Sequence, residues 1–226
     1  MTEESKAVKA HCNRCLRETN HQVLFSHEEK GTEMIDEEMG LGINWSITNE
    51  LLKCLGCDDV VMRQTTRNSE DYNEVQYFPP TIQRQMPDWI GRFPHDNGET
   101  FRKANPKKAY IGNLLRQIYI ALNNDCPALA VMGIRGLLEH VMIDRVGDQG
   151  TFADNLKEFE KQGFVGAKQR KQLEGVLEIG HAAIHRSYEP NKAAVDFALG
   201  FTETLLQNTY LHDVKVVVPS RRRKRP

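Results

Sequence analysis

Two patterns of hydrophobic and polar residues divide the chain. Up to about residue 77, apolar residues occur in short runs with β-branched and aromatic side chains, as in residues 22–25 and 43–47, and these runs predict β-strands. A further strand is expected over residues 59–65. Residues 28–42 hold six carboxylates and three glycines, which predicts a solvent-exposed hairpin excursion.

From residue 107 onward the apolar residues follow the helical period. Residues 111, 114, 115, 118, 119 and 122 are apolar or aromatic at the spacing of one helix face. We expect further helices at about 128–146, 152–161, 167–185 and 191–211, with Thr151 and Asn191 as N-caps and Pro127 in a first turn. The helix at 128–146 is apolar nearly all round, which places it at the centre of a helical bundle.

These patterns predict an α+β protein with a small β domain followed by an all-α bundle. Prolines recur between the two, so residues 78–106 are expected to form an irregular connector, in which Trp89, Ile90 and Phe93 pack against a core. The expected organisation is a β domain at 8–77, the connector at 78–106, a helical bundle at 107–213 and a basic tail at 214–226.

Four of the five cysteines form two Cys-x-x-Cys pairs within the β domain. Two tight turns that each present two thiolates suit tetrahedral Zn²⁺ in a structural site, so the sequence predicts a zinc ribbon. Disulfide bonds are the weaker alternative, because a cytosolic compartment is reducing. His11, His21 and His27 are rival ligands that we expect to lie outside the site. The predicted metal ligands are Cys12, Cys15, Cys54 and Cys57.

Charge and composition narrow the class of protein. The 226 residues contain 39% hydrophobic residues and carry a formal charge of −1, which suits a soluble globular chain. The last six residues carry five positive charges, so the rest of the chain is acidic. No apolar run approaches the roughly 20 residues that span a bilayer, and the first residues lack a secretory apolar core. We therefore expect a cytoplasmic protein without a membrane partner.

Polar residues occur where the bundle core is expected. Arg135 and Glu139 are four residues apart on the central helix, and they form either an internal ion pair or part of a polar cleft facing the helix at 167–185. His181 and His185 share one face of that helix, beside Arg186. Three roles are open for the two histidines: acid–base chemistry with Arg186 or Arg135, metal binding with Glu178, or bracing of the helix end.

The order of these motifs resembles a known family. The cysteine pairs are followed by Tyr-Phe-Pro-Pro at residues 77–80, by Arg-x-x-Leu-Glu at residues 135–139, and by Gly-x-x-x-x-His at residues 180–185. This arrangement is similar to the bacterial domain of unknown function 4145 family, and its helical part is similar to the HEPN superfamily. The resemblance implies an α-helical bundle, often dimeric, in prokaryotic antiviral defence or restriction systems.

The same resemblance bears on catalysis. Catalytic HEPN proteins are metal-independent ribonucleases with an Arg-x₄₋₆-His motif. Placed on His185, this motif requires arginine at residue 178, 179 or 180, where this chain has Glu178, Ile179 and Gly180. His181 also stands where the family has asparagine. A ribonuclease that uses His185 with His181 and Arg186 is therefore the alternative hypothesis.

The leading hypothesis is a non-catalytic binding or regulatory module. It combines a zinc ribbon with a HEPN-like bundle, forms a homodimer, and recognises RNA, DNA or a partner protein. Basic residues near the start of the helix at 167–185 and in the tail favour phosphate contacts. The candidate nucleic-acid-binding residues are Lys168, Arg170, Lys171, Arg221, Arg222, Arg223, Lys224 and Arg225.

Overall fold

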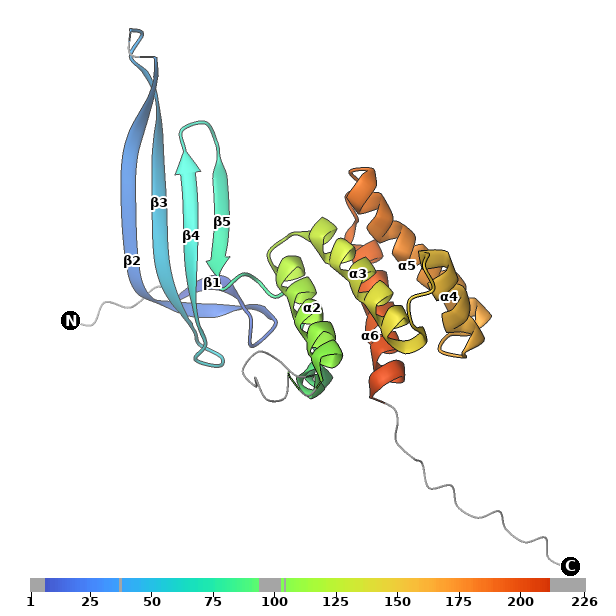
Figure 1. Ribbon diagram of the computed structural model, residues 1–226. Coiled ribbons are helices and arrows are strands. Elements are labelled where there is room, and N and C mark those ends of the chain that lie inside the picture. Colours follow the sequence, from blue (N-terminus) through green and yellow to red (C-terminus); the bar gives the residue numbers. More distant parts are fainter. Residues whose placement is uncertain (1–6, 37, 94–102, 104, 212–226) are drawn as a thin grey trace, which may run out of the picture. The chain divides into compact units, whose positions relative to one another are not determined.

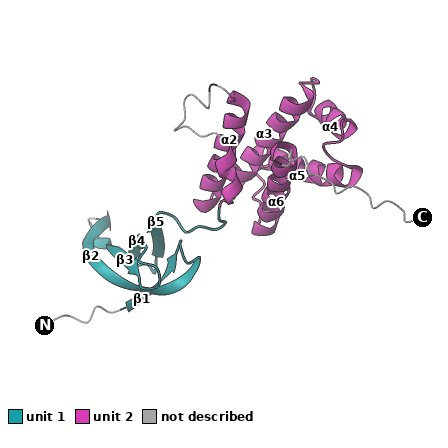
Figure 2. Cartoon of the chain, turned by 90° about the horizontal axis from the view of Figure 1, so that it is seen from below, with its two compact units in different colours: residues 1–85 teal, residues 86–226 magenta. Residues whose placement is uncertain are grey.

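The computed structural model describes residues 7–36, 38–93, 103 and 105–211 (Figure 1). They form two compact units that divide between Gln85 and Met86 (Figure 2). The first contains a β-sheet and the second contains helices, so the α+β class is confirmed. Among the described residues, no helix has the length and apolar character that crossing a bilayer requires.

The first unit is one antiparallel sheet of five strands in sequential order. The strands are β1 (Ala7–Cys12), β2 (Arg17–Asp36), β3 (Leu41–Cys54), β4 (Val60–Asn68) and β5 (Asn73–Phe78). In Figure 1 the β2–β3 hairpin extends well beyond the β4–β5 hairpin. This extension follows from the pairing, since β4 pairs with β3 only as far as Trp45.

The β2–β3 pairing confirms the expected solvent-exposed hairpin excursion at residues 28–42. β2 and β3 pair from His21 opposite Cys54 to Asp36 opposite Leu41, with bulges near Leu24 and Ile35. Polar side chains do not interrupt a ladder of backbone hydrogen bonds, because they point away from it into solvent. The charged segment is therefore exposed but regularly paired.

The second unit follows the helical prediction closely. From residue 86 to 93 and from residue 105 to 211 it contains a 3-10 turn, η1 (Asp88–Arg92), and five helices, α2 (Pro106–Asn123), α3 (Pro127–Val146), α4 (Phe152–Lys161), α5 (Ala167–His185) and α6 (Lys192–Tyr210). The predicted N-caps are confirmed: Thr151 Oγ1 accepts a hydrogen bond from the Asp154 amide, and Asn191 Oδ1 accepts one from the Ala194 amide.

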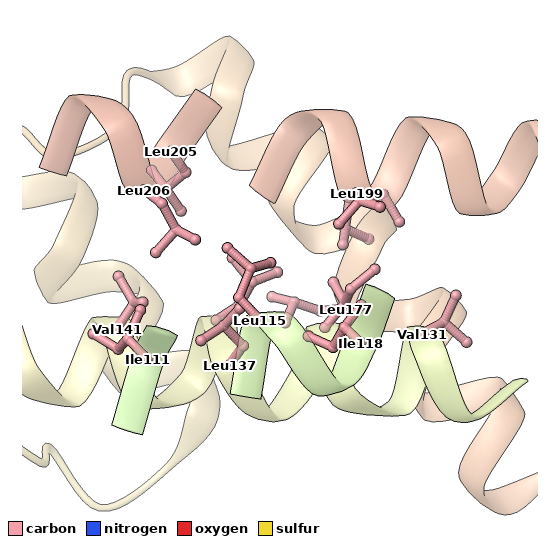
Figure 3. Packing of buried hydrophobic residues seen from close by; sticks show 14 of the residues in the cluster. Ile111, Leu115, Ile118, Val131, Leu137, Val141, Leu177, Leu199, Leu205 and Leu206 are labelled. Carbon is pink, nitrogen blue, oxygen red and sulfur yellow. The ribbon is translucent and has the colours of Figure 1, made fainter. Parts of the chain in front are cut away.

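The core of the helical unit surrounds α3, as its uniform hydrophobicity predicted. α3 packs against α2, α4, α5 and α6. Figure 3 shows Leu115 of α2, Leu137 of α3 and Leu199 of α6 among the buried side chains of this core. Ile90 and Phe93 also belong to it, and Arg116 Nη2 donates to both of their carbonyl oxygens at 3.2 Å. The prediction that this part of the connector packs against a core is confirmed.

Two glycines of α3 and α5 set how closely neighbouring helices approach. A Cβ atom on Gly180 would lie 2.7 Å from the Arg135 Cβ and 2.8 Å from the Val131 carbonyl oxygen. A Cβ atom on Gly133 would lie 2.8 Å from Ile118 Cγ1 of α2. Such distances are shorter than real Cβ contacts, so glycine is required where α5 crosses α3.

Asp144 joins the ends of three helices. Its carboxylate accepts a hydrogen bond from the Tyr210 hydroxyl at 2.8 Å and forms an ion pair with Lys107 Nζ at 3.0 Å. Burial of Asp144 opposes its ionisation, but the Tyr210 hydroxyl and the Lys107 ammonium outweigh that effect and hold the pKa of this carboxyl below its usual value. The network fixes the start of α2 and the end of α6 to the end of α3.

We expect Gly180→Ala to destabilise the helical unit by about 1 to 3 kcal/mol, because the added methyl group meets packed atoms of α3. Gly175→Ala is the matched control on the same helix, where a Cβ atom would meet nothing within 4 Å. It should stabilise the unit by about 0.5 to 1 kcal/mol, since alanine favours helix. Urea unfolding followed by circular dichroism at 222 nm measures both, and equal effects would contradict the close approach.

We expect Asp144→Asn to lower the free energy of unfolding at pH 7 by about 1 to 2 kcal/mol. Because the folded-state pKa of Asp144 lies below its unfolded value of about 3.9, the stabilisation is complete above that value and is lost as pH falls through the folded pKa. The difference in free energy of unfolding between the wild type and the variant should therefore shrink as the pH falls below about 4. Asp196→Asn, which removes the exposed pair with Lys192, is the control and should change the midpoint little at any pH.

Candidate metal centre and helical site

The two cysteine pairs occupy turns of the same conformation. Cys12 ends β1 and Cys54 ends β3, and each turn closes with a backbone hydrogen bond back to that cysteine, from the Leu16 amide at 2.8 Å and from the Asp58 amide at 3.0 Å. Leu16 and Asp58 both have positive φ angles, of 55° and 63°. In each turn, the residue after the second cysteine of the pair has the left-handed conformation and directs the chain into the next strand. This conformation costs free energy for any residue other than glycine.

The turns bring all four predicted sulfurs together. Every pair of Sγ atoms of Cys12, Cys15, Cys54 and Cys57 lies within 4.8 Å, with 3.5 Å from Cys12 to Cys57 and 4.0 Å from Cys15 to Cys54 across the two turns. All are free thiols, so the disulfide alternative is wrong. A tetrahedron of sulfurs about 2.3 Å from a central ion has edges of about 3.8 Å, so the cluster has the dimensions of a metal site.

Hydrogen bonds to the Cys54 sulfur stabilise its thiolate form. Thr19 Oγ1 lies 3.2 Å from Cys54 Sγ, and the Gly56 amide donates to the same sulfur. Burial raises the pKa of the Cys54 thiol, but these hydrogen bonds outweigh it and lower that pKa to about 6. The hydrogen bond to Cys57 raises the pKa of Cys15 to about 12. Without a cation, four adjacent thiols cannot all ionise, and a bound divalent ion would balance the thiolate charge.

The three nearby histidines lie outside the sulfur cluster, as expected. His21 is buried, and its Nδ1 atom lies 3.0 Å from the Thr19 carbonyl oxygen. His27 is exposed and lies 3.5 Å from Glu29. His11 is half-buried on the strand that ends in Cys12.

The structure does not pair Arg135 with Glu139, which corrects one of the two readings of this motif. Arg135 Nη1 instead donates to the Leu177 carbonyl oxygen at 3.0 Å, and its guanidinium lies 4.8 Å from the centroid of the Phe152 ring. The i, i+4 spacing places both residues on α3, but the close approach of α5 at Gly180 offers the arginine a nearer acceptor. Arg135 lines a cleft with α4 and α5 but Glu139 does not, so the other reading, a cleft lined by both residues, holds for Arg135 alone.

His181 and His185 share one face of α5, as predicted. Their ring centroids are 4.5 Å apart, with His181 half-buried and His185 exposed. Glu178 does not join them in a metal-binding group within the described part of the chain. It forms an ion pair with Arg186, and the Arg186 guanidinium holds the pKa of the Glu178 carboxyl below its usual value.

The candidate basic residues are only partly available for phosphate. Lys168 and Lys171 are exposed. Arg170 is neutralised by two carboxylates, with Nη1 2.6 Å from Glu160 and Nε 3.1 Å from Glu174. Arg221, Arg222, Arg223, Lys224 and Arg225 lie outside the described residues.

An apolar row on the sheet was missed by the sequence reasoning. Phe25 of β2 lies opposite Leu51 of β3, Leu51 lies opposite Met62 of β4, and Met62 lies opposite Phe78 of β5. Directly paired residues share one face of a sheet, so these four side chains form a continuous row, which we call the apolar row. Phe25 is 62% exposed, Leu51 38% and Phe78 44%. A row of large apolar side chains open to solvent is typical of a binding surface.

The comparisons with known proteins give one match. The family model described as Domain of unknown function (DUF4145) matches residues 116–225, which is just under half of the chain. This match supports the resemblance drawn from the motifs of the helical part. No curated protein and no solved structure matches the chain. The likeness to the HEPN superfamily stays a prediction.

We expect the purified chain to hold one metal ion that is lost in Cys15→Ser and Cys57→Ser, because three sulfurs leave the tetrahedral shell incomplete. Cys126→Ser is the control, since Cys126 belongs to the helical unit and is not a member of the cluster. Elemental analysis of each variant gives the metal content per chain. A strong chelator should unfold the sheet without changing the helical signal at 222 nm. Equal metal content in all variants would contradict the site.

Proposed function

We propose that this protein is a non-catalytic binding module in which a zinc-clamped sheet presents the apolar row to a partner protein. The observation that carries the proposal is the row itself, which places four large apolar side chains in register on an open face. Burying such side chains against a partner would supply the main binding free energy, at about 25 cal/mol per Å².

The proposed ion is Zn²⁺ with a structural role. Four cysteine sulfurs from two tight turns are the donor set that structural zinc prefers. Zinc bound there would supply a covalent-like cross-link between two turns, and four protein ligands leave no position for substrate. Thr19 and the turn amides would stabilise the thiolates through hydrogen bonds to sulfur.

The contacts of the helical candidates favour binding over ribonuclease activity. In a metal-independent ribonuclease, an arginine beside the catalytic histidine stabilises the anionic transition state. The arginine next to His185 is Arg186, whose charge is engaged by Glu178. His185 itself is exposed on the helix end, beside the ring of His181.

The charges near the apolar row favour a protein partner over nucleic acid. Four residues along each strand from the row, Glu29, Ile47, Thr66 and Glu74 lie in register on the same face. Carboxylates at both ends of this second row repel phosphates. Arg170, one of the candidate phosphate contacts, is neutralised by two carboxylates. The regulatory and defence-related setting stays a prediction from the resemblance.

The proposal is tested by photo-crosslinking in the source cells, with p-benzoylphenylalanine at position 25 or at position 78. Both positions should crosslink to the same protein. Changing Phe78 to serine in the position-25 variant, or Phe25 to serine in the position-78 variant, should lower the yield of this adduct at least about tenfold. Position 35 is the control, because Ile35 is 67% exposed but lies outside the row. An adduct of twice the chain's mass would identify the partner as a second copy, as the predicted homodimer requires.

Three outcomes would contradict the proposal. The first is an adduct from position 35 in the same yield as from positions 25 and 78. The second is an adduct to nucleic acid in place of protein. The third is RNA cleavage by the pure chain that is lost in His185→Ala. The last result would establish the ribonuclease alternative instead.

A further inference from the structure

A cleft of about 230 Å³ opens between α3, α4 and α5 of the helical unit. Its apolar wall is formed by Phe152, Ala153 and Leu156 of α4 and by Leu177 of α5. Arg135 reaches into the same cleft from α3. The cleft belongs to the helical unit alone, so what it binds is independent of the apolar row and of the function proposed for the sheet.

The Arg135 side chain is held in place before any ligand arrives. Its Nη1 atom donates to the Leu177 carbonyl oxygen, and its guanidinium packs over the Phe152 ring. The stem of the side chain lies against Gly180, whose missing Cβ leaves room for the Arg135 Cβ and Cδ. A guanidinium fixed by three contacts loses little conformational freedom when it binds a further group.

The charge of Arg135 has no carboxylate partner within ion-pair distance among the described residues. The two acidic residues of the cleft are engaged by other arginines: Glu174 by Arg170 at 3.1 Å, and Glu178 by Arg186. Arg135 is half-buried and its charge acts on Glu178 only without direct contact, so this cation gains free energy when an anion binds against it.

We propose that this cleft binds a small monocarboxylic acid with an aromatic or branched apolar body. The carboxylate would accept hydrogen bonds from the remaining guanidinium donors of Arg135, and the apolar body would lie against Leu156 and Leu177. A volume of about 230 Å³ suits a ligand of roughly ten non-hydrogen atoms. A phosphate dianion fits less well, because Glu174 and Glu178 are paired with Arg170 and Arg186, which leaves only the single charge of Arg135 to balance the ligand.

The test is a titration of the ¹⁵N-labelled full chain with benzoate, followed by the amide signals of Ala153 and Leu177. We expect saturating shifts with a dissociation constant of about 1 mM, which is typical of so small a ligand. Benzamide has the same shape without the charge and should bind at least about tenfold more weakly. Inorganic phosphate should cause no saturating shift at these amides.

Three variants separate the contribution of the Arg135 charge from that of the open volume of the cleft. Arg135→Gln should weaken benzoate at least about tenfold, and Arg135→Lys, which keeps the charge but lacks the planar fork, should bind with intermediate affinity. Ala153→Phe fills the cleft from the exposed side of α4 and should abolish binding while leaving Arg135 in place. Thermal unfolding at 222 nm shows that each variant is folded.

The proposal is overturned if benzamide binds as tightly as benzoate, if folded Ala153→Phe or Arg135→Gln binds benzoate like the wild type, or if benzoate gives no saturating shift up to about 20 mM. Tighter binding of phosphate than of benzoate would also overturn it. None of these results changes the expected crosslinks of the apolar row, so the two proposals fail separately.

Discussion

The convergence of four cysteine sulfurs is the constraint on which the sheet depends. The buried apolar cluster of the first unit contains only Ala10, Leu52 and Val61 among the described residues, with a few half-buried neighbours. Such a cluster is too small to order strands of up to 20 residues. A metal ion held by the four sulfurs would cross-link the β1–β2 turn to the β3–β4 turn and fix the bases of β2 and β3, from which the register of the long hairpin would follow.

The helical unit is organised by a different constraint, the contact of α5 with α3 at Gly180. This contact determines what Arg135 can reach, because it places the Leu177 carbonyl within hydrogen-bond distance. The arginine therefore contributes to packing through its stem and presents its charge to the cleft. A residue with both roles is expected to be sensitive to changes in the helix crossing as well as to changes in its own side chain.

The sequence predicted the features that are encoded locally. The five helices, their caps at Thr151 and Asn191, and the cysteine cluster follow from spacing and residue type over short distances. The hairpin at residues 28–42 was predicted, but its register was not, because hydrophobicity reports burial and not which backbone groups pair.

The features that were missed depend on contacts between distant segments. The i, i+4 spacing of Arg135 and Glu139 shows that they share a helix face, but which partner the arginine chooses depends on α5. The apolar row joins residues of four strands at unequal sequence spacings, so it becomes visible only when the register is known. The sequence therefore revealed the scaffold of each unit and offered a cleft at Arg135 as one possibility, but it did not reveal the other residues that line that cleft or the apolar row.

The Asp144 network has a consequence for how the helical unit can be joined to other proteins. Lys107 in the first turn of α2 and Tyr210 at the end of α6 bind the same carboxylate, so the entry and exit points of the helices are adjacent. A unit with neighbouring ends can be inserted into a surface loop of a host protein without stretching either chain. The start of α2 and the end of α6 therefore leave the helical core side by side.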